Sequence, residues 1–219
     1  MQPMAERFST SKVTMTTIYL IRHGQKHTVA GDPGLTEIGV KQAQETGKYL
    51  QQFPISKVIA SPFKRTIETA QHISDQLGIV HSLHDALVER MNWNDPSVTR
   101  QQFLQEWVKS TNNREYTPKY GYSSFATGQR IQKVVSEFSN PSEHLVLVTH
   151  GGAIIDYLRN IFGDDQLEPL RKTYAEGDDY EMLNCSINRV VLPTTDLSET
   201  ASATLDLLNF VEHLSDTSE

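Results

Sequence analysis

Two histidines in this chain each stand one residue after a short apolar run and directly before glycine. His23 follows the run 18–21 and Arg22, and His150 follows the run 145–148. Apolar runs of four residues are typical of strands that are buried on both faces of a sheet. Ligands of such sheets bind beyond the carboxyl ends of the strands. Both histidines are therefore predicted to lie at a ligand-binding edge, where Gly24 would let the backbone approach a ligand closely.

Arginines accompany these predicted strand ends. Arg22 directly precedes His23, and Arg65 follows a third predicted buried strand, 57–60. Ser61-Pro62 is an N-cap with proline at the first helical position, so Arg65 is expected in the first turn of a helix. Free N–H groups at a helix N-terminus and a guanidinium both attract negative charge, and the sequence therefore predicts an anion-binding site here.

Each of these four residues has an ordinary structural alternative. Arg22 and His23 would serve equally well as surface ion-pair residues, and His150 as a hydrogen-bonded core histidine. Arg65 would pair with an acidic residue of its own helix. Taken together, the four residues favour a common site over these separate structural roles, because arginine and histidine recur at separate strand ends.

Together, the four side chains suit a phosphoryl group. Guanidinium groups match the geometry of phosphate oxygens. One neutral imidazole can attack phosphorus, and the other, protonated, can stabilise the charge on the equatorial oxygens. The leaving oxygen still needs a proton, and Glu89, after a predicted strand over 79–83, is the best-placed donor. On local grounds alone, a solvent-facing Glu89 paired with Arg90 is the commoner arrangement.

Composition narrows the class of protein. The 219 residues carry a formal net charge of −7, which argues against a nucleic-acid-binding face. The single cysteine, Cys185, allows no intrachain disulfide and fits a cytoplasmic location. No run of 18 apolar residues or signal peptide is present, so no membrane association is predicted. Acidic residues form no paired metal-ligand motif, so neither metal nor cofactor is expected.

Hydrophobic periodicity and capping residues predict the elements that would position these side chains. The stretch 91–122 reads as a helical insertion over the active site, in which aromatic residues are more typical of core or lid packing than of a cofactor site. Residues 1–14 read as a loose leader. Helices are predicted over 36–52, 61–77, 95–110, 123–138 and 153–162, strands over 182–192 and 204–210, the last with an amphipathic helix as the alternative.

Six segments resemble, in the same order, the histidine phosphatase superfamily, specifically its phosphoglycerate mutase-like group. They are Leu20–Gln25, Leu35–Gly39, Ala60–Ala70, Leu87–Arg90, Val148–Gly152 and Asn184–Ile187. The resemblance covers about residues 18–190. It implies an α/β fold, a three-layer αβα sandwich with a mostly parallel central sheet, formed by residues 1–219 as a single domain.

The same resemblance implies roles for individual residues. His23 would become phosphorylated, and Arg22, Arg65 and His150 would hold the phosphoryl group. Glu89 would act first as acid and then as base toward water. In one branch of the family the acid directly follows the second histidine. Here that position is Gly151, which leaves Glu89 as the acid and makes Gly151 a candidate phosphate-binding residue.

The loop after His23 departs from the pattern of phosphoglycerate mutases. It is shorter, and Val29 stands where they have asparagine, although Thr28 offers a hydroxyl for phosphate binding. No segment suited to a second substrate phosphate is recognisable, so hydrolysis is favoured over intramolecular transfer. Lys26, Arg90 and Lys119 are all open candidates for contacting a second acidic group.

The sequence thus predicts a histidine acid-type phosphatase, a phosphoric monoester hydrolase that works without a cofactor on a small phosphorylated substrate. Inorganic phosphate or sulfate should bind in the same pocket. The alternative is a cofactor-dependent phosphoglycerate mutase, and a third possibility is a phospho-ligand binding module without catalysis. The sequence names neither the substrate nor the oligomeric state.

Overall fold

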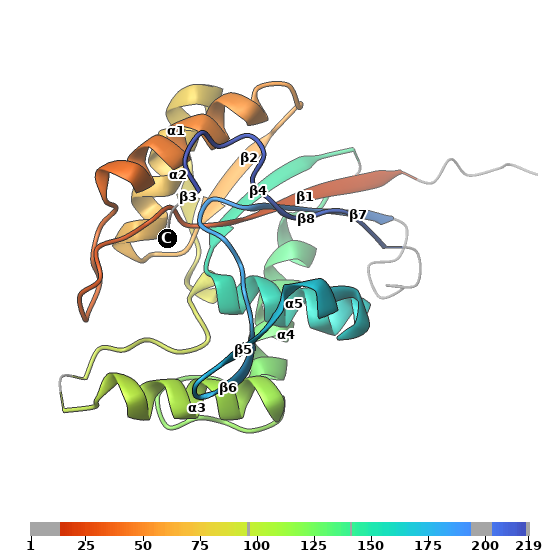
Figure 1. Ribbon diagram of the computed structural model, residues 1–219. Coiled ribbons are helices and arrows are strands. Elements are labelled where there is room, and N and C mark those ends of the chain that lie inside the picture. The colour runs from red at the N-terminus through yellow and green to blue at the C-terminus, as the bar shows by residue number, and fades with distance from the viewer. Residues whose placement is uncertain (1–13, 96, 141, 194–202, 218–219) are drawn as a thin grey trace, which may run out of the picture.

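A computed structural model describes residues 14–95, 97–140, 142–193 and 203–217 and places a six-stranded sheet at the centre of the molecule (Figure 1). The strands lie in the order β3-β2-β4-β1-β7-β8. Four neighbours, β3, β2, β4 and β1, are parallel, whereas β7 runs antiparallel to both β1 and β8. Their bounds are Met15–Arg22 (β1), Lys57–Ala60 (β2), Ser82–Leu83 (β3), His144–Thr149 (β4), Ile187–Pro193 (β7) and Thr204–Phe210 (β8).

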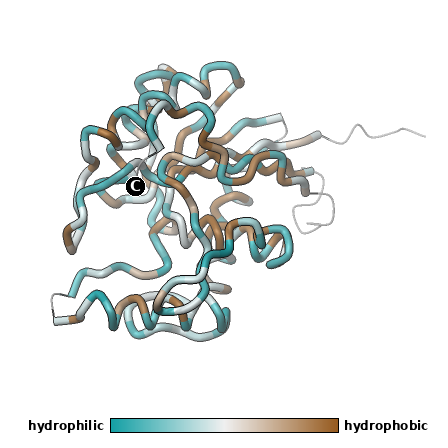
Figure 2. Tube along the Cα trace, in the orientation of Figure 1, coloured by the Kyte–Doolittle hydropathy of each residue, from teal (hydrophilic) through white to brown (hydrophobic). Residues whose placement is uncertain are grey.

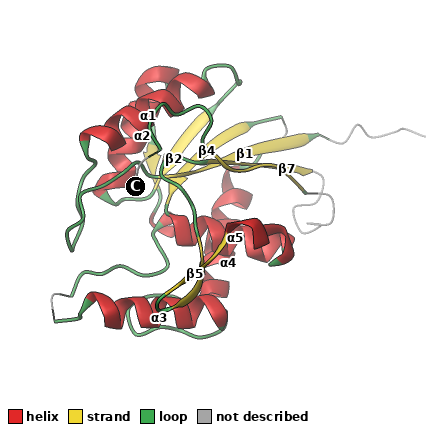
Figure 3. Ribbon diagram, viewed as in Figure 1, coloured by secondary structure: helices red, strands yellow, loops and turns green. Residues whose placement is uncertain are grey.

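Helices cover both faces of this sheet (Figures 1 and 3). One layer contains α1 (Glu37–Leu50) and α2 (Lys64–Leu77), and the other contains α4 (Ser124–Phe138) and α5 (Gly151–Phe162). Alternate residues of β1 enter the two cores: Ile18 and Leu20 pack with α4 and α5, Tyr19 and Ile21 with α1 and α2. The sheet is therefore apolar on both sides, its central strands are mostly hydrophobic (Figure 2), and the predicted three-layer αβα sandwich is confirmed.

A smaller group of elements lies beside the second helix layer. Helix α3 (Arg100–Asn112) packs against a hairpin formed by β5 (Arg171–Tyr174) and β6 (Gly177–Tyr180), as Figure 1 shows. Two short 3-10 helices, Asp85–Leu87 and Asp165–Leu170, complete the described elements. The hairpin is absent from the predicted elements, because its strands are short and largely polar and lack the apolar periodicity that indicates a strand.

Several predicted helix ends are confirmed and others are wrong. The Thr36 and Ser123 hydroxyls accept N–H groups as N-caps of α1 and α4, and α2 ends at Gly78 in the left-handed conformation. Helix α2 begins at Lys64 rather than at Ser61-Pro62. Helix α3 begins at Arg100 rather than at residue 95, because Thr99 and Gln102 form a capping box. Helix α5 begins at Gly151 rather than at 153.

The predicted strands are present in the structure, but some of them begin at other residues than predicted. Strand β3 covers only Ser82–Leu83 of the predicted 79–83, and β7 begins at Ile187 rather than at 182. Residues 204–210 form a strand and not the alternative helix. The predicted leader lies outside the described residues except for Thr14. None of the helices in the described part of the chain is long and apolar enough to cross a bilayer.

Candidate active site

The carboxyl ends of β1, β2 and β4 bring the predicted site residues together. These strands are parallel neighbours, and Arg22 is paired with Thr149 at their last shared position. The backbone N–H of His23 donates to the carbonyl of Thr149 at 3.0 Å, so the chain stays in register as it leaves the sheet. The rings of His23 and His150 lie edge to face with their centroids 5.4 Å apart. The two histidines therefore share one site although 127 positions separate their numbers in the chain.

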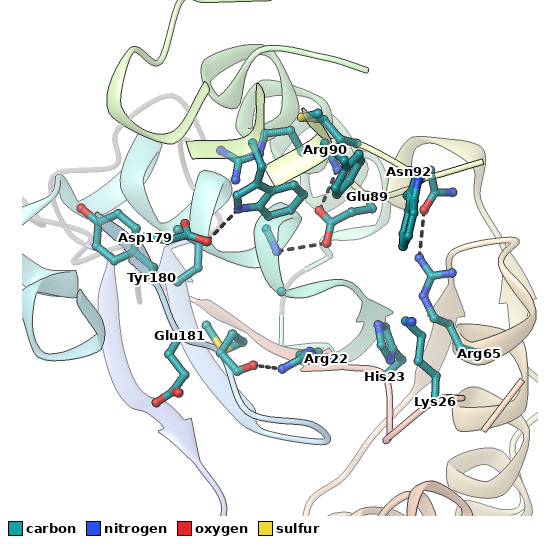
Figure 4. A pocket seen from close by; sticks show the side chains of 18 of the residues that line it. Arg22, His23, Lys26, Arg65, Glu89, Arg90, Asn92, Asp179, Tyr180 and Glu181 are labelled. Atoms are coloured by element: carbon teal, nitrogen blue, oxygen red, sulfur yellow. Dashed lines mark hydrogen bonds between the residues drawn. The ribbon is translucent and has the colours of Figure 1, made fainter. Parts of the chain in front are cut away.

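A cavity of about 370 Å³ opens at this edge (Figure 4). This volume suits a small metabolite. Aromatic side chains from the predicted insertion, including Trp93, Phe103 and Trp107, line one side of it. The charged residues that line it are Arg22, Lys26, Arg65, Glu89, Arg90, Asp179 and Glu181.

His23 is oriented so that one ring nitrogen faces a fixed acceptor. Its Nδ1 lies 2.8 Å from the carbonyl oxygen of Gly24. A carbonyl can only accept, so Nδ1 carries the proton and Nε2 keeps its lone pair. Burial, followed by the charges of Arg22 and Arg65, lowers the pKa of His23 well below its usual value. The ring is therefore neutral near pH 7, which is the form that a nucleophile requires.

Gly24 has a reason to be glycine that differs from the expected one. A Cβ at this position would lie 2.5 Å from the carbonyl oxygen of Gly39 in α1. The absent side chain thus permits close packing between the His23 turn and α1. Glycine is thus required at position 24 by packing against α1, whereas the sequence suggested close approach to a ligand as the reason.

His150 is fully buried behind the cavity surface and does not line it. Its Nδ1 lies 3.1 Å from Nη2 of Arg65, which can only donate, so Nε2 carries the proton and donates to Oγ of Ser61 at 2.9 Å. Burial, and then the charge of Arg65, lowers the pKa of His150 well below its usual value. The His150 ring is therefore neutral near pH 7, and its protonation in the transition state stays a prediction.

The hydrogen bond between Ser61 and His150 also explains why α2 begins later than the sequence predicts. The Ser61 hydroxyl is the hydrogen-bond partner of His150, and Phe63 occupies the N-cap position without a side-chain cap. Both carboxylate oxygens of Asp32 instead accept the N–H of Lys64, at 3.0 and 2.9 Å. The predicted anion site at this helix N-terminus is thus filled by a carboxylate of the protein itself.

Arg65 is buried and points into the cavity rather than along the helix surface. Its Nη2 donates to His150 and to Oδ1 of Asn92, the latter at 3.3 Å, and its Nη1 lies 3.4 Å from Oδ1 of Asp32. Glu68, a candidate partner in the same helix, instead accepts the N–H of Leu35 at 2.6 Å. The local ion-pair alternative for Arg65 is therefore wrong.

Glu89 lies at the N-terminus of α5, on the cavity (Figure 4). Its Oε2 accepts the N–H of Gly152 at 3.1 Å and its Oε1 accepts the N–H of Arg90 at 2.7 Å. A Cβ at Gly152 would lie 2.7 Å from Oε1 of Glu89 and 2.5 Å from the ring of Trp107, so glycine is required for this approach. The solvent-facing alternative for Glu89 is therefore wrong.

Arg90 does not pair with Glu89 through its side chain. The guanidinium is buried, stacks 4.1 Å from the ring centroid of Trp107 and donates to Oγ1 of Thr111 at 3.0 Å. Its Nη1 lies 3.5 Å from the buried carboxylate of Asp156. Arg90 thus ties the segment after Glu89 to α3 and α5.

The remaining predicted residues differ in placement. Arg22 lines the cavity and donates through Nη1 to the carbonyl of Met182. Gly151 also lines it, next to Arg22. Thr28 is exposed on the loop after β1 and is not among the cavity-lining residues, so the structure does not bring its hydroxyl to the site.

Sequence reasoning missed several residues that complete the site. Asn92 and Ser61 are hydrogen-bond partners of Arg65 and His150, and Asp179 reaches the cavity from the unpredicted hairpin and Glu181 from the residue directly after it. No local signal marks these four. The described residues contain no group of three or more histidine, cysteine or acidic side chains suited to a metal ion.

The low pKa values of the two site histidines predict a loss of stability in mild acid. The unfolded chain binds protons near pH 6.5, where the folded site does not, so the free energy of unfolding should fall as the pH drops from about 6.5, by at most ~1.4 kcal/mol per pH unit per histidine. Asp156, whose pKa burial raises to about 6, acts in the opposite sense. Urea unfolding of wild type and His150→Gln between about pH 7 and pH 5 isolates the effect. Equal pH slopes for the two proteins would contradict it.

Residues 18–196 match the model of the histidine phosphatase superfamily (branch 1). The chain is 32% identical over 183 residues to a 2,3-bisphosphoglycerate-dependent phosphoglycerate mutase from Bartonella tribocorum, a match that covers 74% of this chain and 88% of that protein. It is 26% identical to an uncharacterized phosphatase from Bacillus subtilis, over 69% of this chain and 80% of the relative.

Among solved structures, the fold is similar to that of a mycobacterial glucosyl-3-phosphoglycerate phosphatase in complex with inorganic phosphate. The TM-score is 0.69 at 21% sequence identity, and the superposition covers 91% of this chain and 99% of that one. At this identity the similarity establishes the arrangement of the elements.

Proposed function

The chain belongs to the histidine phosphatase superfamily, and from this premise we propose that it is a phosphomonoester hydrolase of the histidine acid-type class that works through a phosphohistidine intermediate on His23. The observation that carries the proposal is the state of His23. Its Nδ1 proton is fixed on the Gly24 carbonyl, its ring is neutral, and it lies on a cavity that also contains Arg22 and Arg65.

In the first step, Nε2 of His23 attacks phosphorus. The N–P bond forms while the P–O bond to the leaving group breaks, and Glu89 gives its proton to the departing oxygen. The position of Glu89 supports this role, because its carboxyl lies on the cavity and is held by the N–H groups of Gly152 and Arg90. In the second step Glu89 takes a proton from water, the water oxygen attacks phosphorus, and phosphate leaves as the N–P bond breaks.

Arg22 and Arg65 would balance the negative charge of the transferring group. His150 acts, in this proposal, first through Arg65, whose guanidinium it holds by accepting a hydrogen bond at Nδ1. His150 can take up a second proton only after Arg65 moves from Nδ1 toward a bound phosphoryl group. Inorganic phosphate or sulfate should occupy the same place as the transferring group.

Hydrolysis is preferred over phosphoglycerate mutation because of where the charges lie. A mutase holds a substrate with further negative charge beyond the transferring phosphoryl group. In this cavity the basic residues Arg22, Lys26 and Arg65 lie near His23, whereas Asp179 and Glu181 lie at the opposite end (Figure 4). The guanidinium of Arg90, which also lines the cavity, already faces the buried carboxylate of Asp156. Because the chain is 32% identical to a mutase from Bartonella tribocorum, the mutase remains the alternative that the experiment must exclude.

The test compares the two reactions directly. The purified protein should release inorganic phosphate from p-nitrophenyl phosphate, and it should not interconvert 2- and 3-phosphoglycerate with added 2,3-bisphosphoglycerate. Interconversion faster than hydrolysis would replace the proposal with the mutase. Binding of phosphate without either reaction would leave the non-catalytic module, although His23, Arg22, Arg65, His150 and Glu89 are all present.

The domain organisation and location are also proposals. We propose that residues 1–219 form a single domain in which 91–122 covers the active site, since Trp93, Phe103 and Trp107 line the cavity. A cytoplasmic location is consistent with a single, buried cysteine, Cys185. The partner is a small phosphorylated molecule, with no role for nucleic acid or membrane.

A further inference from the structure

Lys26 places a third cation beside the reacting histidine. Its side chain lines the cavity, and Figure 4 shows its amino group next to the ring of His23 and close to Arg65. The backbone at this point is fixed, because Lys26 forms an isolated antiparallel bridge with Leu35 and the N–H of His27 donates to the carbonyl of Gly34 at 3.2 Å. The folded loop therefore fixes the backbone from which this side chain extends into the cavity.

In the part of the chain that the structure describes, no carboxylate lies within ion-pair distance of this amino group. Among the described residues no ion pair includes Lys26, and its one hydrogen bond is a long contact of 3.4 Å from Nζ to the carbonyl of His27. Burial, and then the charges of Arg65 and Arg22, lowers the pKa of Lys26. Three like charges around one cavity repel one another, and a bound anion between them removes that cost.

The anion that Lys26 meets must lie at the His23 end of the cavity. The sequence offered Lys26, Arg90 and Lys119 as contacts for a second acidic group. The Arg90 side chain already contacts Trp107, Thr111 and Asp156, and Lys119 is exposed and does not line the cavity. Of the three, Lys26 is therefore the one whose cationic group can meet an anion in the cavity. The far end of the cavity carries Asp179 and Glu181 and would repel a second acidic group of the substrate.

We propose that Lys26 is a third cationic ligand of the transferring phosphoryl group, acting with Arg22 and Arg65, and not a receptor for a second acidic group on the substrate. This inference rests on the proposed hydrolase and deepens it. The ammonium would hold a non-bridging oxygen in the ground state and in the transition state, where negative charge is spread over these oxygens. The preferred substrate is then a monophosphate whose leaving group carries no second acid.

The test replaces the charge and keeps the length of the side chain. Lys26→Met should weaken binding of inorganic phosphate, measured by calorimetry, and lower kcat/KM by roughly tenfold to a hundredfold, the range for a lost charge-assisted hydrogen bond. Lys26→Arg should recover most of both. Lys64→Met is the matched control, because Lys64 is an exposed cation beside Arg65 that does not line the cavity.

Two substrates separate the possible contacts of Lys26. p-Nitrophenyl phosphate has one acidic group, and 3-phosphoglycerate has a carboxylate in addition to its phosphate. If Lys26 holds the phosphoryl group, Lys26→Met lowers kcat/KM for both by a similar factor. A loss confined to 3-phosphoglycerate, or phosphate binding as strong in Lys26→Met as in Lys64→Met, would overturn the inference.

Failure of the proposed function would be visible separately. A wild-type protein that binds inorganic phosphate but does not hydrolyse p-nitrophenyl phosphate would refute the hydrolase. The phosphate-binding comparison of Lys26→Met, Lys26→Arg and Lys64→Met would then still decide whether Lys26 contacts the phosphoryl group.

Discussion

The His23→Ala variant is expected to lose about 10⁴-fold or more in kcat/KM for any phosphomonoester, because the group that forms the bond to phosphorus is gone. The wild-type protein, quenched after mixing with ³²P-labelled substrate, should carry acid-labile and base-stable label, the stability pattern of a phosphohistidine. The variant should carry none. The two measurements address the same atom, since Nε2 is the ring nitrogen of His23 that the Gly24 carbonyl leaves free.

Controls separate loss of the nucleophile from loss of the fold. His23 is buried, so alanine leaves a gap beside Arg22 and Arg65. His23→Asn is the second variant, because its side-chain amide can still donate to the Gly24 carbonyl while offering no nucleophilic nitrogen. His27→Ala, an exposed histidine in the following loop, should retain wild-type activity. Turnover undiminished in both His23 variants would rule out His23 as the nucleophile.

The Glu89→Gln variant is expected to lower kcat by about 10²–10⁴-fold for substrates with poor leaving groups. Glutamine keeps one acceptor, for the Gly152 N–H, and loses the acceptor for the Arg90 N–H together with the proton donor. An alkyl phosphate releases a strongly basic alkoxide and needs that proton, whereas p-nitrophenolate leaves without it. The slope of log kcat against leaving-group pKa, measured over a series of aryl and alkyl phosphates, should therefore become steeper.

Glu181→Gln is the matched control for this series. Glu181 also lines the cavity, but it lies at the opposite end and forms a 3.8 Å ion pair with Lys172. Its removal should leave the leaving-group slope unchanged. If Glu89→Gln slowed every substrate by the same factor, Glu89 would not be the acid, and its role would be limited to positioning or to the hydrolysis of the intermediate.

Much of the scaffold could be predicted because the signals for it are local. The predicted strands 18–21, 57–60 and 145–148 all lie in strands of the structure, and Thr36 and Ser123 cap α1 and α4. A strand of this kind is specified by the apolar character of a few consecutive residues, and a cap by contacts within about four residues. The hairpin Arg171–Tyr180 was not predicted because it is held in place by the packing of β6 against α3, and its own residues carry no strand signal.

The assignment of partners could not be predicted in the same way. Ser61, followed by proline, is typical of a helix N-cap, yet its hydroxyl binds His150. The carboxylate of Asp32 accepts the N–H at the start of α2 instead. Glu89 has a commoner local alternative, which packing excludes by placing Gly152 beside it. In each case several partners compete for one polar group, and the winner is decided by residues distant in the chain.

By itself, the sequence determined which chemical groups follow which strands, and hence that imidazoles and guanidiniums stand at the ends of β1 and β4 and shortly after β2. Tertiary structure alone decided their states: that His150 is neutral and turned to Arg65, that Thr28 stays outside the site, and that Lys26 faces it. The physical reason is that residue type and order are local properties. Burial, hydrogen-bond partners and the resulting charge depend on neighbours that only the folded chain supplies.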